Sequence, residues 1–136
     1  MTKKILVTGA AGFIGYHLSK QLLEQGFEII GLDGMTTYYD IKLKMRRAQN
    51  LQQNPKFKMI EAMLQDTDAV QNCFETEKPD IVVHLAAQAG VRYSLENPRS
   101  YIDSNLVGTF NIIQFCKELS VGHLLMASTS SVYGGI

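Results

Sequence analysis

The chain has 136 residues, of which 46% are hydrophobic, and its 13 basic and 13 acidic residues give a formal net charge of zero. A chain of this length can bury the core of one domain of ordinary size. The even charge balance argues against a nucleic-acid-binding or membrane-surface protein. The N-terminal region has no long apolar segment for secretion or membrane crossing, so we expect a cytoplasmic protein.

A glycine-rich turn follows the first predicted strand, which covers residues 5–7 and runs directly into TGAAGFIG, from Thr8 to Gly15. A strand that ends in such a turn and opens a helix forms a backbone cradle for the pyrophosphate of a dinucleotide. Gly9 would allow the tight turn, Gly12 would let phosphate approach the backbone, and Gly15 would let the helix pack near the strand. The alternative is an ordinary strand-to-helix turn without a ligand.

The helix after this turn has Ile14, Leu18 and Leu22 at a spacing of four residues, which predicts a face directed toward a sheet. Gly26 is its predicted end.

A second strand, over residues 28–32, leads into Asp33, which lies 18 residues after Gly15. An acidic residue at about 20 residues from the glycine motif typically binds the adenosine ribose hydroxyls. Its charge would repel a 2′-phosphate, which favours NAD over NADP.

The segment after a tyrosine-bearing loop is basic, with Lys42, Lys44, Arg46 and Arg47. These residues could hold a 2′-phosphate, but a solvated helix face is the favoured interpretation.

Residues 57–62 and 81–85 are predicted as the third and fourth strands, and Asp66 is the predicted N-cap of the helix between them. That helix should bury Val70, Cys73 and Phe74.

The sequence HLAAQAGVRYSLENP follows the fourth strand, and its small residues lie where strand ends would meet a cofactor. A close-packed loop is an equally good interpretation of this segment. Pro98 then begins a predicted helix that runs to about Leu119. Its predicted inner stripe is Ile102, Leu106, Phe110 and Ile113.

A fifth strand, over residues 124–127, ends in the hydroxyl cluster of residues 128–131. Five strands with crossover helices predict an α/β fold, a Rossmann-type doubly wound parallel sheet. Cys73 and Cys116 are predicted to be buried free thiols. The histidines His17, His84 and His123 suggest no metal site.

Several segments together resemble one family: TGAAGFIG, the Asp33 position, HLAAQAGVRYS, DSNLVGT and STSSVYG. They are similar to the extended short-chain dehydrogenase/reductases that act on nucleotide sugars. The combination of TTYYD with AGVRYSLENP is most similar to UDP-glucuronate 4-epimerases. This resemblance implies that enzyme-held NAD takes hydride from C4 of the sugar and returns it to the opposite face.

The resemblance assigns Thr129 to the catalytic Ser/Thr position, and Arg92, Ser128 and Ser130 to the substrate. An exposed loop arginine and a polar strand end are the alternatives. The residues expected to contact NAD are Gly9, Gly12, Phe13, Ile14, Gly15, Asp33, Leu64, Ala86, Ala87 and Asn105. The family usually has Gly-Asp after the third strand, where this chain has Ala62-Met63, so the adenine contact should be weaker.

The catalytic Tyr-x-x-x-Lys pair of the family lies on the helix after the hydroxyl cluster, beyond Ile136. We therefore expect residues 1–136 to be the NAD-binding Rossmann domain of an epimerase, without its later strands and sugar-binding domain and inactive alone. Exposed apolar surface should make it a homodimer or cause self-association. Alternatives are a nucleotide-sugar 4,6-dehydratase or reductase, or a non-catalytic NAD-binding or redox-sensing module.

Overall fold

The computed structural model describes residues 2–36, 41–87 and 91–128, apart from the side chains of residues 91–93. Its strands alternate with helices, as the sequence predicts. The strands are β1 (Lys4–Thr8), β2 (Glu28–Asp33), β3 (Phe57–Glu61), β4 (Ile81–His84) and β5 (His123–Met126). The helices are α1 (Phe13–Glu24), α2 (Ile41–Gln52), α3 (Thr67–Glu77), α4 (Val91–Glu96), α5 (Pro98–Tyr101), η1 (Ile102–Val107) and α6 (Gly108–Glu118).

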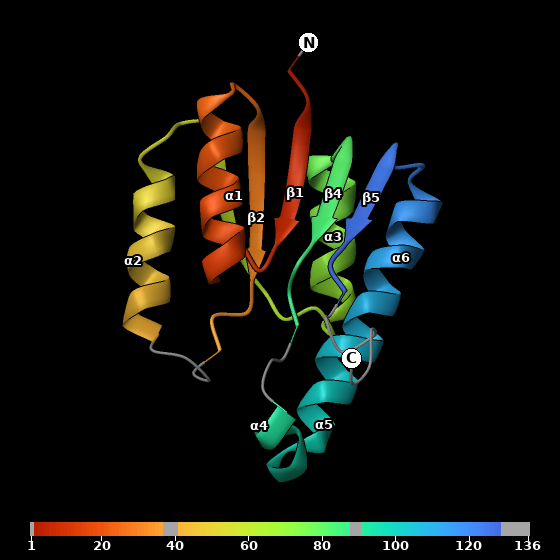
Figure 1. Ribbon diagram of the computed structural model, residues 1–136. Coiled ribbons are helices and arrows are strands. Elements are labelled where there is room, and N and C mark those ends of the chain that lie inside the picture. Colours follow the sequence, from red (N-terminus) through yellow and green to blue (C-terminus); the bar gives the residue numbers. More distant parts are fainter. Residues whose placement is uncertain (1, 37–40, 88–90, 129–136) are drawn as a thin grey trace, which may run out of the picture.

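The strands form one parallel sheet in the order β3-β2-β1-β4-β5. Helices α1 and α2 cover one face, and α3 and α6 cover the other (Figure 1). This arrangement confirms the predicted doubly wound Rossmann-type fold. The strand order reverses beside β1, and open α/β sheets bind ligands at the carboxyl ends of the strands at such a point.

Each face of the sheet has its own apolar core. On the α3/α6 face, Phe74, Val70 and Ile112 are fully buried against β1, β2 and β4. On the α1/α2 face, Leu23 and Leu51 pack against the opposite side of the same strands. The central strands β1, β2 and β4 read as nearly unbroken apolar runs because both of their faces are covered.

The rotation of α1 about its axis differs from the prediction. The start of the predicted stripe does not face the sheet, since Ile14 is 66% exposed, whereas Leu22 at its other end packs against the core as predicted. The buried positions of this helix are Gly15, Ser19 and Leu23. A Cβ on Gly15 would lie 2.1 Å from the carbonyl oxygen of Gly9. The helix therefore presents its smallest residue to the turn, and this contact sets its rotation.

The segment predicted as one helix from Pro98 to Leu119 contains a π turn, η1. The N–H of Gly108 donates to the carbonyl of Asp103, five residues earlier, which widens the helix at this point. Such turns occur frequently at functional sites. The sequence also gave no prediction of the short helix α4, which lies between the fourth strand and Pro98.

The predicted inner stripe of this helix is wrong. Ile102, Leu106, Phe110 and Ile113 are between 45% and 67% exposed. The residues that α6 buries are Gly108, Asn111, Ile112, Phe115 and Cys116. Gly108 and Asn111 face inward because each contacts Leu64. A Cβ on Gly108 would meet the Leu64 side chain at 2.6 Å, and the Asn111 side chain donates to the Leu64 carbonyl at 2.9 Å.

Both cysteines are buried and unbridged, and burial raises the pKa of the Cys73 and Cys116 thiols to about 11. A thiol with so high a pKa is a poor nucleophile at neutral pH. Asp66 caps α3 as predicted, since its side chain accepts the Ala69 N–H at 3.2 Å. Within the described residues, every helix is too short or too polar to cross a membrane.

Candidate functional site

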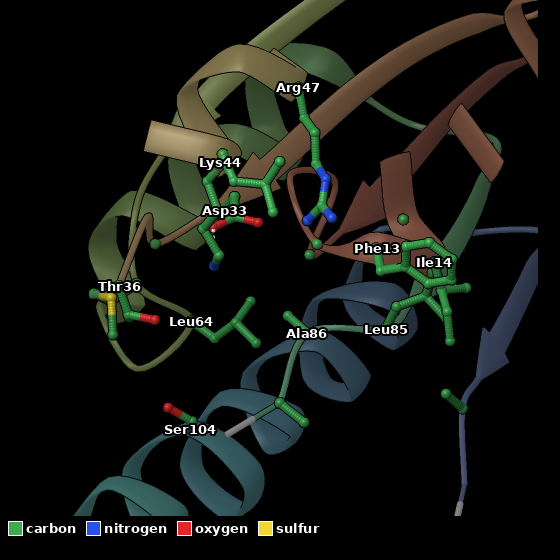
Figure 2. Close-up of a pocket in the computed structure, with 18 of the residues that line it drawn as sticks. Phe13, Ile14, Asp33, Thr36, Lys44, Arg47, Leu64, Leu85, Ala86 and Ser104 are labelled. Atoms are coloured by element: carbon green, nitrogen blue, oxygen red, sulfur yellow. Dashed lines mark hydrogen bonds and ion pairs between the residues drawn. The ribbon is translucent and has the colours of Figure 1, made fainter. Parts of the chain in front are cut away.

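A pocket with a volume of about 520 Å³ lies at the carboxyl ends of the strands. Its wall comes from the turn after β1, the end of β2, helix α2, the segments after β3 and β4, and η1 (Figure 2). The pocket therefore occupies the position at which the fold predicts a ligand site.

The glycine turn forms one side of this pocket. Gly9 has a φ of +74°, a conformation that favours glycine, and its N–H donates to the Leu32 carbonyl at 2.7 Å. The N–H of Gly12 donates to the Gly9 carbonyl at 3.0 Å and closes the turn. Gly12 precedes α1 and has no side-chain cap, and it lines the pocket. A backbone surface of this kind can approach an anionic ligand closely.

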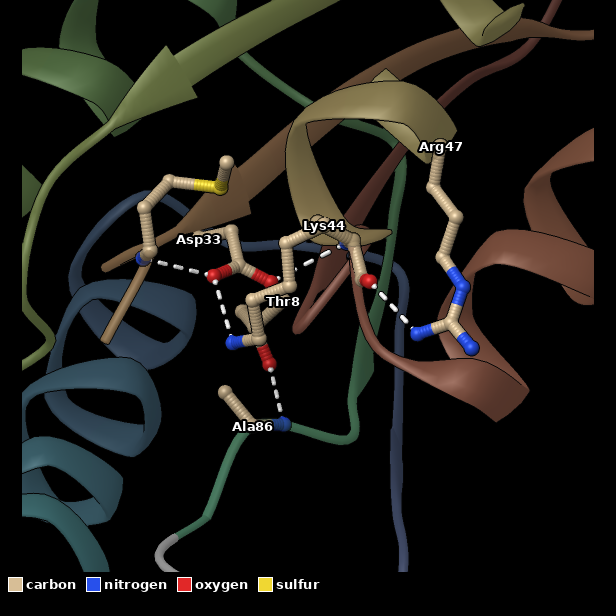
Figure 3. Close-up of polar contacts among 7 residues, drawn as sticks. Thr8, Asp33, Lys44, Arg47 and Ala86 are labelled. Carbon is tan, nitrogen blue, oxygen red and sulfur yellow. Dashed lines mark hydrogen bonds and ion pairs between the residues drawn. The ribbon is translucent and has the colours of Figure 1, made fainter. Parts of the chain in front are cut away.

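Asp33 is 4% exposed and holds its carboxylate on the pocket wall through several hydrogen bonds (Figure 3). Oδ2 accepts the N–H of Ala11 at 3.0 Å, and Oδ1 accepts the N–H of Met35 at 2.7 Å and Nζ of Lys44 at 3.2 Å. Within the described residues Oδ2 accepts only the Ala11 N–H, and each carboxylate oxygen has two lone pairs, so one lone pair of Oδ2 is left for a ligand. The carboxylate is therefore a rigid acceptor for a hydroxyl donor.

Two cations of α2 also belong to the site, contrary to the interpretation of this segment as a solvated helix face. Lys44 pairs with Asp33, and the Arg47 Nη1 donates to the Ala11 carbonyl at 3.1 Å. Lys42 and Arg46 are exposed, as that interpretation predicts. The three-residue spacing of Lys44 and Arg47 places them on one face of the helix. This spacing is the sequence feature that could have identified them.

The structure brings the residues expected to contact the cofactor together in this pocket, except for Asn105. Those that line it are Gly9, Gly12, Phe13, Ile14, Gly15, Asp33, Leu64, Ala86 and Ala87. Asn105 lies in η1 but does not line the pocket, whereas its neighbour Ser104 does. Both residues lie in the π turn, which the sequence did not predict.

Within the described part of the chain, no residue assigned to substrate or catalysis is found on the pocket wall. Thr129 and Ser130 lie outside the described residues, as does the Arg92 side chain. Ser128 is described; it is exposed and does not line the pocket, although the preceding Ala127 does.

Other wall residues were not among the expected site residues. They are Gly34, Thr36, Leu43, Gln65, Leu85, Ser104 and Ala127. Most of them are in loops, whose side-chain directions depend on the packing of neighbouring elements. Among the described residues, no group of three or more His, Cys, Asp or Glu side chains could hold a metal ion. The chemistry of the site is that of a glycine cradle, one fixed carboxylate, two cations and apolar walls.

Comparisons with known proteins agree with this geometry. Residues 6–136 match the family model described as GDP-mannose 4,6 dehydratase. The chain is 51% identical, over 131 residues, to a Rhizobium meliloti protein named "Probable UDP-glucuronate 4-epimerase". The alignment covers 96% of this chain and 38% of that protein. A UDP-glucuronate 4-epimerase from Thermodesulfobacterium geofontis is 44% identical, with 96% of this chain and 40% of that protein covered.

A similar solved structure is that of UDP-glucuronic acid 4-epimerase from Bacillus cereus in complex with UDP-glucuronic acid and NAD. Its TM-score is 0.89 at 36% identity, and 98% of this chain and 42% of that chain are covered. The chain thus spans about two fifths of the length of these relatives. From the family match, the fold and the glycine turn, we conclude that the chain belongs to the GDP-mannose 4,6-dehydratase family.

Proposed function

We propose that this chain binds NAD in the pocket at the carboxyl ends of β1, β2 and β4. The observation that supports this proposal is the buried Asp33 carboxylate beside the glycine turn, whose Oδ2 has one lone pair that no described residue uses. The turn would receive the pyrophosphate, and Asp33 would accept hydrogen bonds from the adenosine ribose. Leu64 and Met63 would give the adenine an apolar wall in place of the carboxylate usual in the family.

We further propose that the chain is the nucleotide-binding part of a UDP-glucuronate 4-epimerase. When bound, NAD supplies reversible hydride acceptance at the sugar carbon. Thr129 would hold the sugar hydroxyl that loses its proton, while Ser128 and Ser130 would bind neighbouring sugar atoms. Arg92 would pair with the carboxylate or a phosphate of the substrate. The similarity to UDP-glucuronate 4-epimerases supports these assignments.

The experiment that tests the epimerase proposal is to sequence the gene beyond the codon for Ile136 and express any continuation. We expect a Tyr-x-x-x-Lys pair followed by a second domain, and a full-length protein that interconverts UDP-glucuronate and UDP-galacturonate. Loss of water to give a 4-keto-6-deoxy sugar, measured with a nucleotide-sugar substrate that carries a 6-hydroxyl, would contradict it and identify a dehydratase. A stop codon at this point would contradict it in favour of a binding module.

A first prediction concerns Arg47, whose side chain donates a hydrogen bond to the Ala11 carbonyl and so fixes the position of the glycine turn. Arg47→Met should weaken NAD binding about tenfold, because one charge-assisted hydrogen bond is worth about 1.5–3 kcal/mol. Arg46→Met is the matched control, since Arg46 precedes it on α2 and is exposed. Calorimetric titration of both variants checks this prediction. Equal affinities for the two variants would contradict a role for Arg47.

A second prediction concerns the exposed stripe Ile102, Leu106, Phe110 and Ile113, which forms an apolar face without cover within the described residues. We propose that the chain self-associates through it, as a homodimer or larger assembly, because contiguous exposed apolar patches mark association sites. Analytical ultracentrifugation over a concentration series should show mass increasing with concentration. Leu106→Lys with Phe110→Lys should shift the chain to monomer. A wild-type chain that remains a well-folded monomer throughout would contradict the proposal.

A further inference from the structure

A chain of hydrogen-bonded side chains runs behind the pocket wall, from β1 through β4 to α6. The Thr8 Oγ1 lies 2.7 Å from the His84 Nδ1, and the His84 Nε2 lies 2.9 Å from the Thr109 Oγ1. His84 is 5% exposed. The Thr8 Oγ1 also accepts the N–H groups of Leu85 and Ala86, each at 3.0 Å; Figure 3 shows the second of these. Both of these residues line the pocket.

The number of lone pairs on the Thr8 hydroxyl determines the donor and the acceptor in each hydrogen bond of this series. A threonine hydroxyl has two lone pairs and one O–H. Leu85 and Ala86 occupy both lone pairs of Thr8, so its O–H donates to the His84 Nδ1. In a neutral imidazole the proton is then on Nε2, which donates to Thr109. His84 is therefore held in one tautomer, with both ring nitrogens satisfied.

Protonation of His84 would break this arrangement. A second N–H, on Nδ1, would face a hydroxyl oxygen whose lone pairs are already used by Leu85 and Ala86. Thr8 would have to release one of these backbone groups. Burial lowers the pKa of His84, which favours the neutral ring. Its neighbours in register are Thr8 on β1 and Met126 on β5, and its partner on α6 is Thr109; none of these three side chains carries a charge, and burial is the cause of the lowered pKa.

The wall that Thr8 holds is in direct contact with the glycine turn. A Cβ on Gly9 would lie 3.1 Å from the Ala86 N and Cα. The His84 carbonyl also accepts the N–H of Ala127, another residue of the pocket wall, at 3.1 Å. One residue thus joins the segments that follow β4 and β5. A change in the hydrogen bonds of His84 would therefore alter the positions of the pocket-wall residues Ala86 and Ala127.

We infer that Thr8, His84 and Thr109 form a positioning relay that holds the Leu85–Ala86 wall against the glycine turn only while His84 is neutral. The relay makes nucleotide binding weaken when the pH falls far enough to protonate His84. This inference rests on the proposed NAD site, but the relay itself is a property of the chain without ligand. His84 acts through Thr8 and is a positioning residue.

The direction of the pH dependence follows from linkage. The pKa of His84 is lower in the folded chain than in the unfolded chain, where it is about 6.5. The unfolded chain therefore binds the proton more readily, and the free energy of unfolding falls as pH decreases below about 6.5. Above about pH 6.5 the ring is neutral in both states, and this contribution is fully present.

The first test is the imidazole NMR spectrum of the unaltered chain without ligand, recorded from about pH 8 to 5. The expected result is a protonated Nε2 and an unprotonated Nδ1 on His84, with titration below that of an ordinary histidine. A proton on Nδ1, or an ordinary titration, would overturn the relay. This test holds whether or not the chain binds NAD.

The second test is the pH dependence of NAD affinity by calorimetry. Wild-type affinity should fall in acid, with a slope approaching about tenfold per pH unit below the pKa of His84. In His84→Gln the neutral amide cannot titrate, so this fall should be absent, whereas His17→Gln and His123→Gln, at exposed histidines, should retain it. Identical profiles for His84→Gln and wild type would overturn the inference.

Two substitutions of Thr8 test whether its hydroxyl is needed. Thr8→Val should weaken NAD affinity about tenfold or more, and Thr8→Ser, which keeps the hydroxyl, should restore it. Equal affinities for these two variants would overturn the relay. No NAD binding by the wild type at about pH 8, where the ring is neutral, would contradict the proposed function alone.

Discussion

Gly15→Ala is expected to destabilise the chain severely, by more than about 3 kcal/mol, and to abolish nucleotide binding. A Cβ at this position would lie 2.1 Å from the Gly9 oxygen and 2.8 Å from the Gly9 carbon. These are backbone atoms and cannot rotate away as a side chain would. The gain of about 1 kcal/mol from alanine in a helix is much smaller than this overlap. Urea unfolding followed by circular dichroism measures the loss.

The matched control for this substitution is Gly122→Ala. A Cβ there would meet the Asp80 carbonyl oxygen at 3.4 Å, which is an ordinary contact. Gly122 is exposed and lies outside the pocket wall. Its variant should unfold within about 1 kcal/mol of wild type. If Gly15→Ala were as stable as Gly122→Ala, the close packing of α1 against the glycine turn would be wrong.

The second large effect is expected from Asp33→Asn, which keeps the shape of the side chain and removes its charge. NAD affinity should fall about tenfold to a hundredfold, because hydrogen bonds to charged groups are worth about 1.5–3 kcal/mol. The ratio of NAD to NADP affinity should fall further, since the 2′-phosphate would no longer meet a carboxylate and Lys44 would lose its partner. Calorimetric titration with both nucleotides measures this ratio.

Asp68→Asn is the control for Asp33→Asn, because Asp68 is exposed in the first turn of α3 and does not line the pocket. It should leave both nucleotide affinities unchanged. Urea unfolding of the Asp33 variant is needed as well, because its amide would face the N–H of Ala11 or Met35 where an oxygen now accepts. An unchanged NAD to NADP ratio in a folded Asp33→Asn variant would show that Asp33 does not select the cofactor.

The order of the elements could be predicted from the sequence because local features determine it. Apolar runs bounded by turns mark the strands, and the turn at Gly9 and the cap at Asp66 mark helix starts. The spacing from the glycine turn to Asp33 was enough to place this acid on the pocket wall, because parallel strands end at one edge of the sheet.

The rotations of the helices could not be predicted in the same way. The four-residue spacing of the stripe at Ile102 is real, but tertiary contacts of Gly108 and Asn111 with Leu64 turn that stripe outward. The π turn has no distinctive composition. His84 occupies an ordinary strand position in the sequence, and its importance depends on hydroxyls that lie 76 and 25 residues away.

The most direct test of the central claim is a calorimetric titration of the wild-type chain with NAD and with NADP at about pH 8, where His84 is neutral. The proposed site predicts one NAD bound per chain and an NADP affinity at least about tenfold weaker, owing to the buried Asp33 carboxylate. Absence of NAD binding by the folded chain, or tighter binding of NADP, would contradict it.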